Sequence, residues 1–107
     1  MARMIQVRNG MIAKKIEIDQ PSLTIGRSRK NTVCIKDEVV SGVHAEIFVE
    51  KNEKGENVYF IQDLQSTNGL YLNKNKITCK QLRHKDKVRI GRSVFTFLEY
   101  DTDSKSH

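Results

Sequence analysis

Short alternating segments separated by turn residues constrain this chain more than any other feature. Met4–Arg8 alternates between apolar and polar residues from Ile5 onward and is followed by Asn9-Gly10, a pair that favours a tight β-hairpin turn. Similar segments recur roughly every 8–12 residues, whereas the 3.6-residue periodicity of helices is weak throughout. This spacing predicts an all-β sandwich, in which two sheets pack face to face.

The expected strands cover most of the chain. They lie over residues 4–8, 12–18, 23–25, 32–35, 45–50, 57–64, 69–73, 76–79, 87–90 and 93–100. A chain of 107 residues supports one domain with a modest core. We therefore expect a single domain over residues 1–100, followed by a polar, disordered tail over residues 101–107.

The composition narrows the class of protein and of partner. The net charge is +6, which favours an anionic partner without distinguishing a phosphopeptide from nucleic acid or acidic lipid. Because there is no apolar run long enough for a signal peptide or a membrane span, we expect an intracellular protein, cytoplasmic or nuclear, without membrane insertion.

Cys34 and Cys79 lie in strand-like segments, and we interpret them as buried, reduced thiols. The Cys and His spacings match no metal site, so we expect no metal or cofactor.

Three short motifs place phosphate-binding groups at the ends of expected strands. They are Gly26-Arg27, Ser41-Gly42-Val43-His44 and Ser66-Thr67-Asn68-Gly69. Arginine offers a planar fork of donors that fits two phosphate oxygens, and hydroxyl groups can hold the third. Taken singly, each motif is also ordinary turn chemistry, with glycine supplying positive φ and Ser, Thr and Asn folding back on the backbone. Together they indicate a phosphate site.

Catalytic motifs are missing from the sequence. Ser41 and His44 suggest a nucleophile and base, but no Gly-x-Ser-x-Gly turn is present to expose a serine nucleophile. The glycine-rich loops that cradle nucleotide phosphates are also absent. We therefore expect a non-enzymatic protein without a small-molecule substrate.

The order and spacing of the motifs resemble the forkhead-associated (FHA) domain. Ala45-Glu46-Ile47 after the histidine and Asp63-Leu64 before the serine extend the resemblance, which covers residues 24–97. It implies an FHA-like β-sandwich of two mainly antiparallel sheets with its binding loops at one end. It also implies that the partner is a protein or peptide phosphorylated on threonine.

The resemblance assigns a role to each motif residue. Arg27 and Thr67 would contact the phosphate, the Ser41 hydroxyl would hold a phosphate oxygen, and the Asn68 amide would bond the peptide main chain. Residues that would shape the loops rather than bind are Gly26, His44, Ser66 and Gly69. Possible auxiliary contacts are Arg29, Lys30 and Gly42.

Two positions depart from the family pattern. Gly42 stands where many members have a basic or polar side chain, and Val39 stands where some have a second cation. A phosphate carries nearly two negative charges. With one cation of the usual set in place, we expect a weaker site, unless Lys36, Arg29 or Lys30 compensates.

Two other functions remain open from the sequence. The first is phosphorylation-independent protein binding through a sheet face. The second is polyanion binding, to nucleic acid or acidic lipid, through a basic stripe that Lys87, Arg89 and Arg92 could form. Stacking aromatic residues are not interleaved with these cations, which disfavours nucleic acid.

Overall fold

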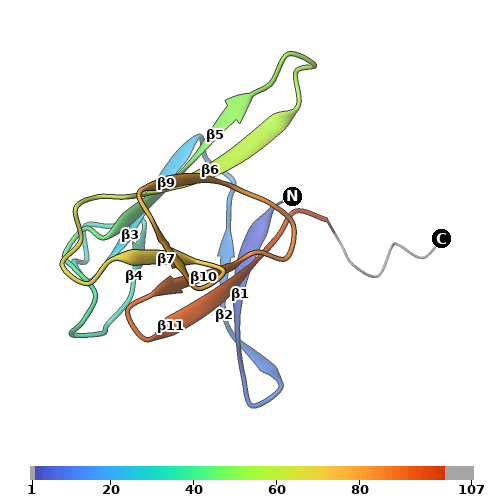
Figure 1. The fold of residues 1–107 in the computed structure, drawn as a ribbon. Coiled ribbons are helices and arrows are strands. Elements are labelled where there is room, and N and C mark those ends of the chain that lie inside the picture. The colour runs from blue at the N-terminus through green and yellow to red at the C-terminus, as the bar shows by residue number, and fades with distance from the viewer. Residues whose placement is uncertain (1, 101–107) are drawn as a thin grey trace.

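The computed structural model describes residues 2–100 as two β-sheets that face each other (Figure 1). The expected tail over residues 101–107 lies outside the described residues. The strands are β1 (Arg3–Arg8), β2 (Met11–Glu17), β3 (Ser22–Gly26), β4 (Val33–Cys34), β5 (Ala45–Lys51), β6 (Asn57–Asp63), β7 (Leu70–Leu72), β8 (Asn75–Ile77), β9 (Cys79–Leu82), β10 (Lys87–Ile90) and β11 (Ser93–Leu98). Residues 2–100 contain no helix long and apolar enough to cross a membrane.

The strand order brings distant parts of the sequence together. One sheet has the order β2-β1-β11-β10-β7-β8, and the other has the order β4-β3-β5-β6-β9. Every pair given a register is antiparallel except β3 with β4, which is parallel. The predicted sandwich of two mainly antiparallel sheets is confirmed. Because β3, β5 and β6 are neighbours, the loops that follow β3, precede β5 and follow β6 meet at one end of the sandwich.

The core lies between the sheets and follows the two-residue alternation of the strands. In β10, Val88 and Ile90 are fully buried while Lys87 and Arg89 are exposed. The ring of Tyr59 in β6 packs against that of Phe97 in β11, with 5.5 Å between ring centres, and so joins the two sheets. Burying apolar area in this way supplies most of the stability of such a fold.

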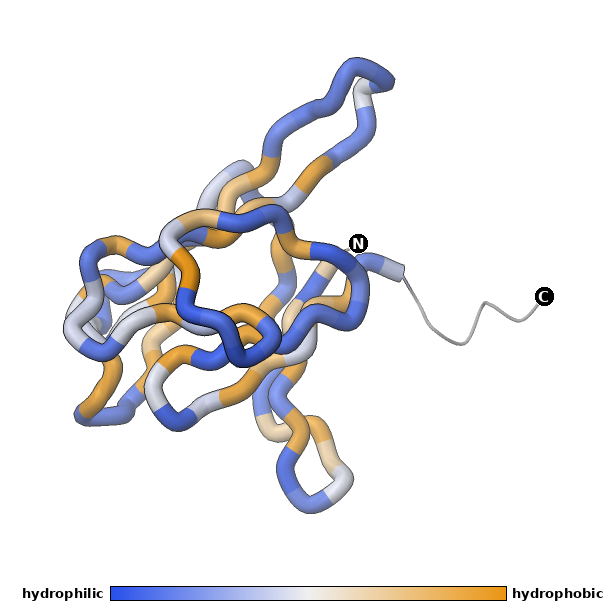
Figure 2. The backbone as a smooth tube through the Cα atoms, viewed as in Figure 1, coloured by the Kyte–Doolittle hydropathy of each residue, from blue (hydrophilic) through white to orange (hydrophobic). Residues whose placement is uncertain are grey.

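Two hairpins project from the body of the sandwich. The tip of the β5–β6 hairpin is hydrophilic, whereas the β1–β2 hairpin carries hydrophobic residues toward its tip (Figure 2). Those exposed residues are Val7, Met11 and Ile12, and the hairpin contains a β-bulge between Gln6 and Val7.

The expectation of a single strand over residues 76–79 is wrong. The chain forms β8, leaves the first sheet at Thr78 and enters the second sheet as β9. The carbonyl of Thr78 accepts a hydrogen bond from the Asp63 backbone N–H, with a nitrogen–oxygen distance of 2.8 Å. No glycine or proline marks the crossing, so the pattern of the two short strands resembles that of one.

The expectation of buried cysteines is also wrong. Cys79 is exposed and Cys34 is only partly buried, although both are free thiols. Each lies in an edge strand of the five-stranded sheet, where one side of the strand faces solvent. The Cys34 thiol donates a hydrogen bond to the carbonyl of Arg27, with a sulfur–oxygen distance of 3.2 Å.

Candidate functional site

The three loops that carry the motifs are joined by direct hydrogen bonds around Ser41. The backbone N–H of Arg27 donates to the Ser41 carbonyl, with a nitrogen–oxygen distance of 2.9 Å. The backbone N–H of Thr67 donates to the Ser41 hydroxyl oxygen, also at 2.9 Å. The loops after β3, before β5 and after β6 are therefore joined into one surface by hydrogen bonds within the protein.

Gly26 is required where β3 enters the site. A Cβ atom at this position would lie 2.3 Å from the carbonyl oxygen of Gly42. The same carbonyl accepts hydrogen bonds from the Ser28 backbone N–H and from the Asn31 side-chain amide. Asn31 also donates to the Ser28 carbonyl and so holds the loop after β3 against the loop before β5. Asn31 was not predicted from the sequence, because an asparagine in a loop carries no distinguishing signal.

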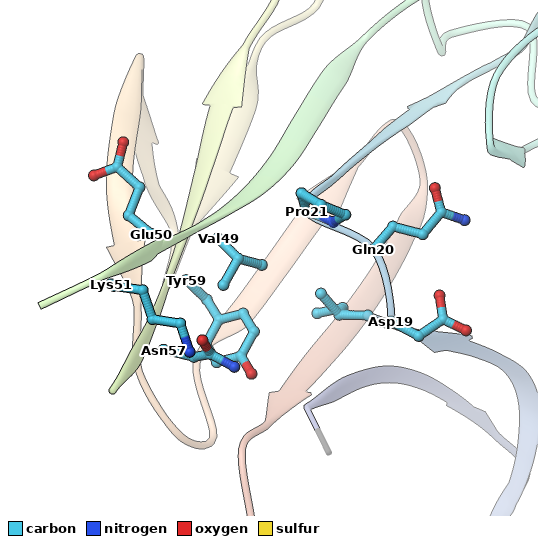
Figure 3. Close-up of a pocket in the computed structure, with 9 residues that line it drawn as sticks. Asp19, Gln20, Pro21, Val49, Glu50, Lys51, Asn57 and Tyr59 are labelled. Atoms are coloured by element: carbon cyan, nitrogen blue, oxygen red, sulfur yellow. The ribbon is translucent and has the colours of Figure 1, made fainter. Parts of the chain in front are cut away.

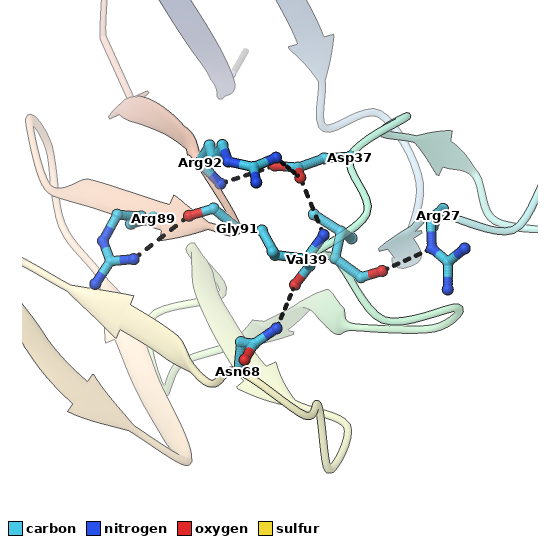
Figure 4. Close-up of polar contacts among 8 residues, drawn as sticks. Arg27, Asp37, Val39, Asn68, Arg89, Gly91 and Arg92 are labelled. Carbon is cyan, nitrogen blue, oxygen red and sulfur yellow. Dashed lines mark hydrogen bonds and ion pairs between the residues drawn. The ribbon is translucent and has the colours of Figure 1, made fainter.

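Arg27 is exposed, and among residues 2–100 a single side-chain nitrogen holds it in orientation. Its Nε atom donates to the Val40 carbonyl, with a nitrogen–oxygen distance of 3.0 Å. Figure 4 shows the two terminal nitrogens of Arg27 directed away from this carbonyl. The fork of donors that suits two phosphate oxygens is therefore held in place and still accessible.

Ser41 and Asn68 each keep hydrogen-bonding capacity. The Ser41 oxygen accepts the bond from Thr67, which leaves its hydroxyl proton free to be donated. The Asn68 side-chain Nδ2 donates to the Val39 carbonyl, with a nitrogen–oxygen distance of 2.9 Å (Figure 4). Its amide oxygen and second N–H remain for other partners. Thr67 and Asn68 are both exposed.

His44 is fully buried directly beneath these loops. Its Nδ1 accepts a hydrogen bond from the Ser41 backbone N–H, so Nδ1 carries no proton and Nε2 is the donor. Nε2 donates to the Gly69 carbonyl, with a nitrogen–oxygen distance of 2.8 Å. The backbone of His44 also bonds Ile25 and Leu64. The imidazole thus connects two loops and has no surface to offer a ligand.

Asp63 and Ser66 fix the turn that presents Thr67 and Asn68. The Ser66 hydroxyl donates to the Asp63 carboxylate and accepts a hydrogen bond from the Gly69 backbone N–H. Gly69 adopts a φ of 89°, a left-handed conformation that favours glycine. The turn is therefore fixed by side chains that lie behind the exposed pair.

Asp37 supports the segment whose carbonyls hold Arg27 and Asn68. Its carboxylate accepts hydrogen bonds from the backbone N–H groups of Arg92 and Val39, and its Oδ1 pairs with Arg92 Nη1 at 2.8 Å (Figure 4). The backbone N–H of Arg92, then that of Val39, and the charge of Arg92 lower the pKa of Asp37 below its ordinary value of 3.8. This role of Asp37 was not predicted from the sequence. An aspartate that bonds the N–H two residues later is an Asx-turn signal that could have indicated it.

The structure brings the four predicted binding residues into one set of contacts, and it places the auxiliary residues around them. Arg29, Lys30 and Gly42 are exposed in the flanking loops. Arg92, in contrast, is paired with Asp37, so it does not complete a stripe of free cations with Lys87 and Arg89. Within residues 2–100, no group of three His, Cys, Asp or Glu side chains is placed to hold a metal ion.

A separate hollow of about 480 Å³ lies at the other end of β3 (Figure 3). Its lining residues are Ile18, Asp19, Gln20, Pro21, Val49, Glu50, Lys51, Asn57 and Tyr59. None of the predicted site residues lines it.

Comparisons with known proteins agree with this geometry. The family model for the FHA domain matches residues 23–91, more than half of the chain. The oxoglutarate dehydrogenase inhibitor of Corynebacterium efficiens is 28% identical over 97 residues, which cover 91% of this chain and 65% of that protein. The chain thus spans less than two thirds of the length of this curated relative.

Two solved structures show the same fold. The Mycobacterium tuberculosis protein EmbR, in complex with a low-affinity phosphopeptide, is 26% identical with a TM-score of 0.77, covering 91% of this chain and 24% of EmbR. A structure from an analysis of phosphothreonine-dependent FHA domain interactions is 25% identical with a TM-score of 0.76, covering 94% of this chain and 99% of that one.

Proposed function

Because this chain belongs to the FHA domain family, we propose that it is a non-enzymatic module that binds proteins phosphorylated on threonine and recruits them in a phosphorylation-dependent way. One observation carries the proposal. Arg27, Ser41, Thr67 and Asn68 come from three loops and are linked through the short segment of residues 39–41.

Each of these residues has a distinct proposed task at the phosphate. The terminal nitrogens of Arg27 bind two phosphate oxygens, and the Ser41 hydroxyl donates its free proton to the phosphate. The Thr67 hydroxyl reaches the phosphate from the opposite loop. Charge-assisted bonds of this kind are about twice as strong as neutral ones, so the phosphate dominates the affinity.

Asn68 has a different proposed task, at the peptide backbone. Its amide oxygen and remaining N–H suit the N–H and C=O groups of an extended main chain beside the phosphothreonine. Because these groups exist in every peptide, this contact adds affinity without selecting a sequence.

The charge at the site sets the expected strength of binding. One arginine is held at the centre, and Gly42 and Val39 add no second cation there. Arg29 and Lys30 are exposed nearby and raise the local positive potential. We expect micromolar affinity, about −8 kcal/mol, rather than nanomolar.

A library of oriented phosphothreonine peptides tests this function directly. The immobilised chain should enrich a subset of phosphopeptides, and phosphatase treatment of the library should abolish retention. Arg27→Ala in parallel should retain far less of the enriched peptides. Equal retention of treated and untreated libraries would contradict the proposal.

A further inference from the structure

A second cationic surface lies on the outer side of the six-stranded sheet. It is a hollow of about 500 Å³ lined by Asn73, Lys74, Lys87, Arg89 and Val94, which we call the sheet-face groove. Lys87 and Arg89 point outward from β10 because the alternating Val88 and Ile90 point into the core. Arg89 and Arg27 lie at opposite sides of the view in Figure 4, so the groove is separate from the proposed phosphate site.

The cations of the groove are not paired with a carboxylate anywhere in residues 2–100. Lys74, Lys87 and Arg89 form no ion pair with any described residue, and the groove lining contains no carboxylate. Two of them are nevertheless held in position. Lys87 Nζ donates to the Thr96 hydroxyl at 2.9 Å, and the guanidinium carbon of Arg89 lies 4.1 Å from the centre of the Tyr71 ring. Less side-chain entropy is then lost when an anion binds.

An apolar side chain lies among these charges. Val94 is paired with Arg89 across β10 and β11 and is 46% exposed. A ligand that fills the groove must therefore combine negative charge with an apolar group.

We propose that the sheet-face groove docks an acidic segment of a protein partner, independently of phosphorylation. Carboxylates of the segment pair with Lys74, Lys87 and Arg89, and one apolar side chain covers Val94. Charge complementarity selects the acidic residues and sets their position in the groove.

The same residues fit a nucleic acid less well. No aromatic side chain lines the groove, and the nearby Tyr71 ring is covered by the Arg89 guanidinium, so bases have no open stacking surface. Arg92 would have lengthened the cationic surface, but it is paired with Asp37. Three cations around a valine form a short site suited to a few carboxylates.

An NMR titration of the whole chain tests the groove. The probe is a synthetic peptide that repeats Glu-Glu-Leu, compared with its Gln-Gln-Leu counterpart and with oligothymidine. We expect saturable amide shifts at the groove residues with the acidic peptide, and at least about tenfold weaker binding of the glutamine version.

Two variants and a matched control distinguish binding at the groove from non-specific electrostatic attraction of the acidic peptide. Lys87→Glu/Arg89→Glu should weaken the acidic peptide at least about tenfold, and Val94→Glu should weaken it without removing a cation. Lys51→Glu/Lys54→Glu changes the net charge equally on a distant hairpin and should alter binding by no more than about twofold.

The contradicting outcomes are equally specific. Equal losses in the two double variants, shifts that do not saturate, or tighter binding of oligothymidine at the same amides would overturn the proposal. Phosphopeptide affinity should be unchanged in Val94→Glu, so failure of the groove and failure of the proposed phosphothreonine binding are distinguishable.

Discussion

The Nε2 atom of His44 donates a hydrogen bond to the carbonyl oxygen of Gly69 across 2.8 Å, beneath the surface formed by the loops. The other ring nitrogen accepts the backbone N–H of Ser41. A single buried side chain therefore sets the positions of the serine hydroxyl and of the turn that presents Asn68. In this site, the groups that bind and the groups that position them are different residues.

His44→Ala should lower stability and phosphopeptide affinity together. The change leaves a cavity and two backbone groups without partners, which costs about 2–4 kcal/mol of unfolding free energy. Urea denaturation alongside titration calorimetry measures both effects. Unchanged stability with lost binding would mean that the imidazole contacts the ligand instead of supporting the loops.

Replacing Asn68 should lower phosphopeptide affinity with little effect on stability. Asn68→Ala removes one exposed hydrogen bond to Val39, so the unfolding free energy should fall by no more than about 1.5 kcal/mol while phosphopeptide affinity falls more than tenfold. Asn68→Asp should bind more weakly still, because a carboxylate cannot donate and repels the phosphate. Fluorescence polarisation ranks the variants, and an aspartate variant that binds like wild type would remove Asn68 from the site.

Arg27→Ala should weaken phosphopeptide binding by about 10- to 100-fold, equivalent to about 1.5–3 kcal/mol. Arg27→Lys should recover only part of this loss, because a point charge cannot form the two-pronged contact. The melting temperature should hardly change, since Arg27 is exposed. Calorimetry that gives equal affinities for wild type and Arg27→Ala would exclude Arg27 as the phosphate anchor.

Asp37 predicts a pH dependence of stability. Its pKa is depressed in the folded protein, so its stabilising contribution is complete above the ordinary value of 3.8 and is lost as the pH falls through the lower, folded value. Asp37→Asn should therefore be less stable than wild type at neutral pH, and the difference should shrink as the solution becomes more acidic than about pH 4.

Denaturation curves across this pH range provide the measurement for Asp37. Glu38→Gln is the matched control, because Glu38 is an exposed neighbour without a hydrogen bond or ion pair among residues 2–100. Its stability should follow wild type at every pH. A constant difference between Asp37→Asn and wild type would show that the carboxylate charge is not involved.

The sequence predicted much of the fold because its signals are local. Asn9-Gly10 predicted the first hairpin, and the alternating segments predicted most of the strands. The change of sheet at Thr78 was not predicted. The sheet that a strand joins depends on partners that are distant in the sequence. Cys79 was placed inside for the same reason, since an apolar residue in an edge strand can face either way.

In the candidate site, too, residues with local sequence signals were predicted and residues that depend on distant partners were not. Arg27, Ser41, Thr67 and Asn68 carry recognisable motif chemistry, and the structure places them together. Their supports were harder to predict. The pairing of Asp37 with Arg92 joins residues 55 positions apart, and only the packed turn between β10 and β11 brings them together.

Four matched peptides test the central claim of phosphothreonine recognition most directly. A sequence selected from the library is synthesised with threonine, phosphothreonine, phosphoserine or glutamate at the central position, and binding is followed by fluorescence polarisation. The phosphothreonine peptide should bind at micromolar concentration. Burial of the extra γ-methyl group of threonine is worth about 0.8 kcal/mol, and its branched side chain has fewer rotamers to lose, so phosphoserine should bind several-fold more weakly. Threonine and glutamate should not bind, because glutamate has fewer acceptor oxygens and about half the charge. Equal binding of the threonine and phosphothreonine peptides would contradict the account.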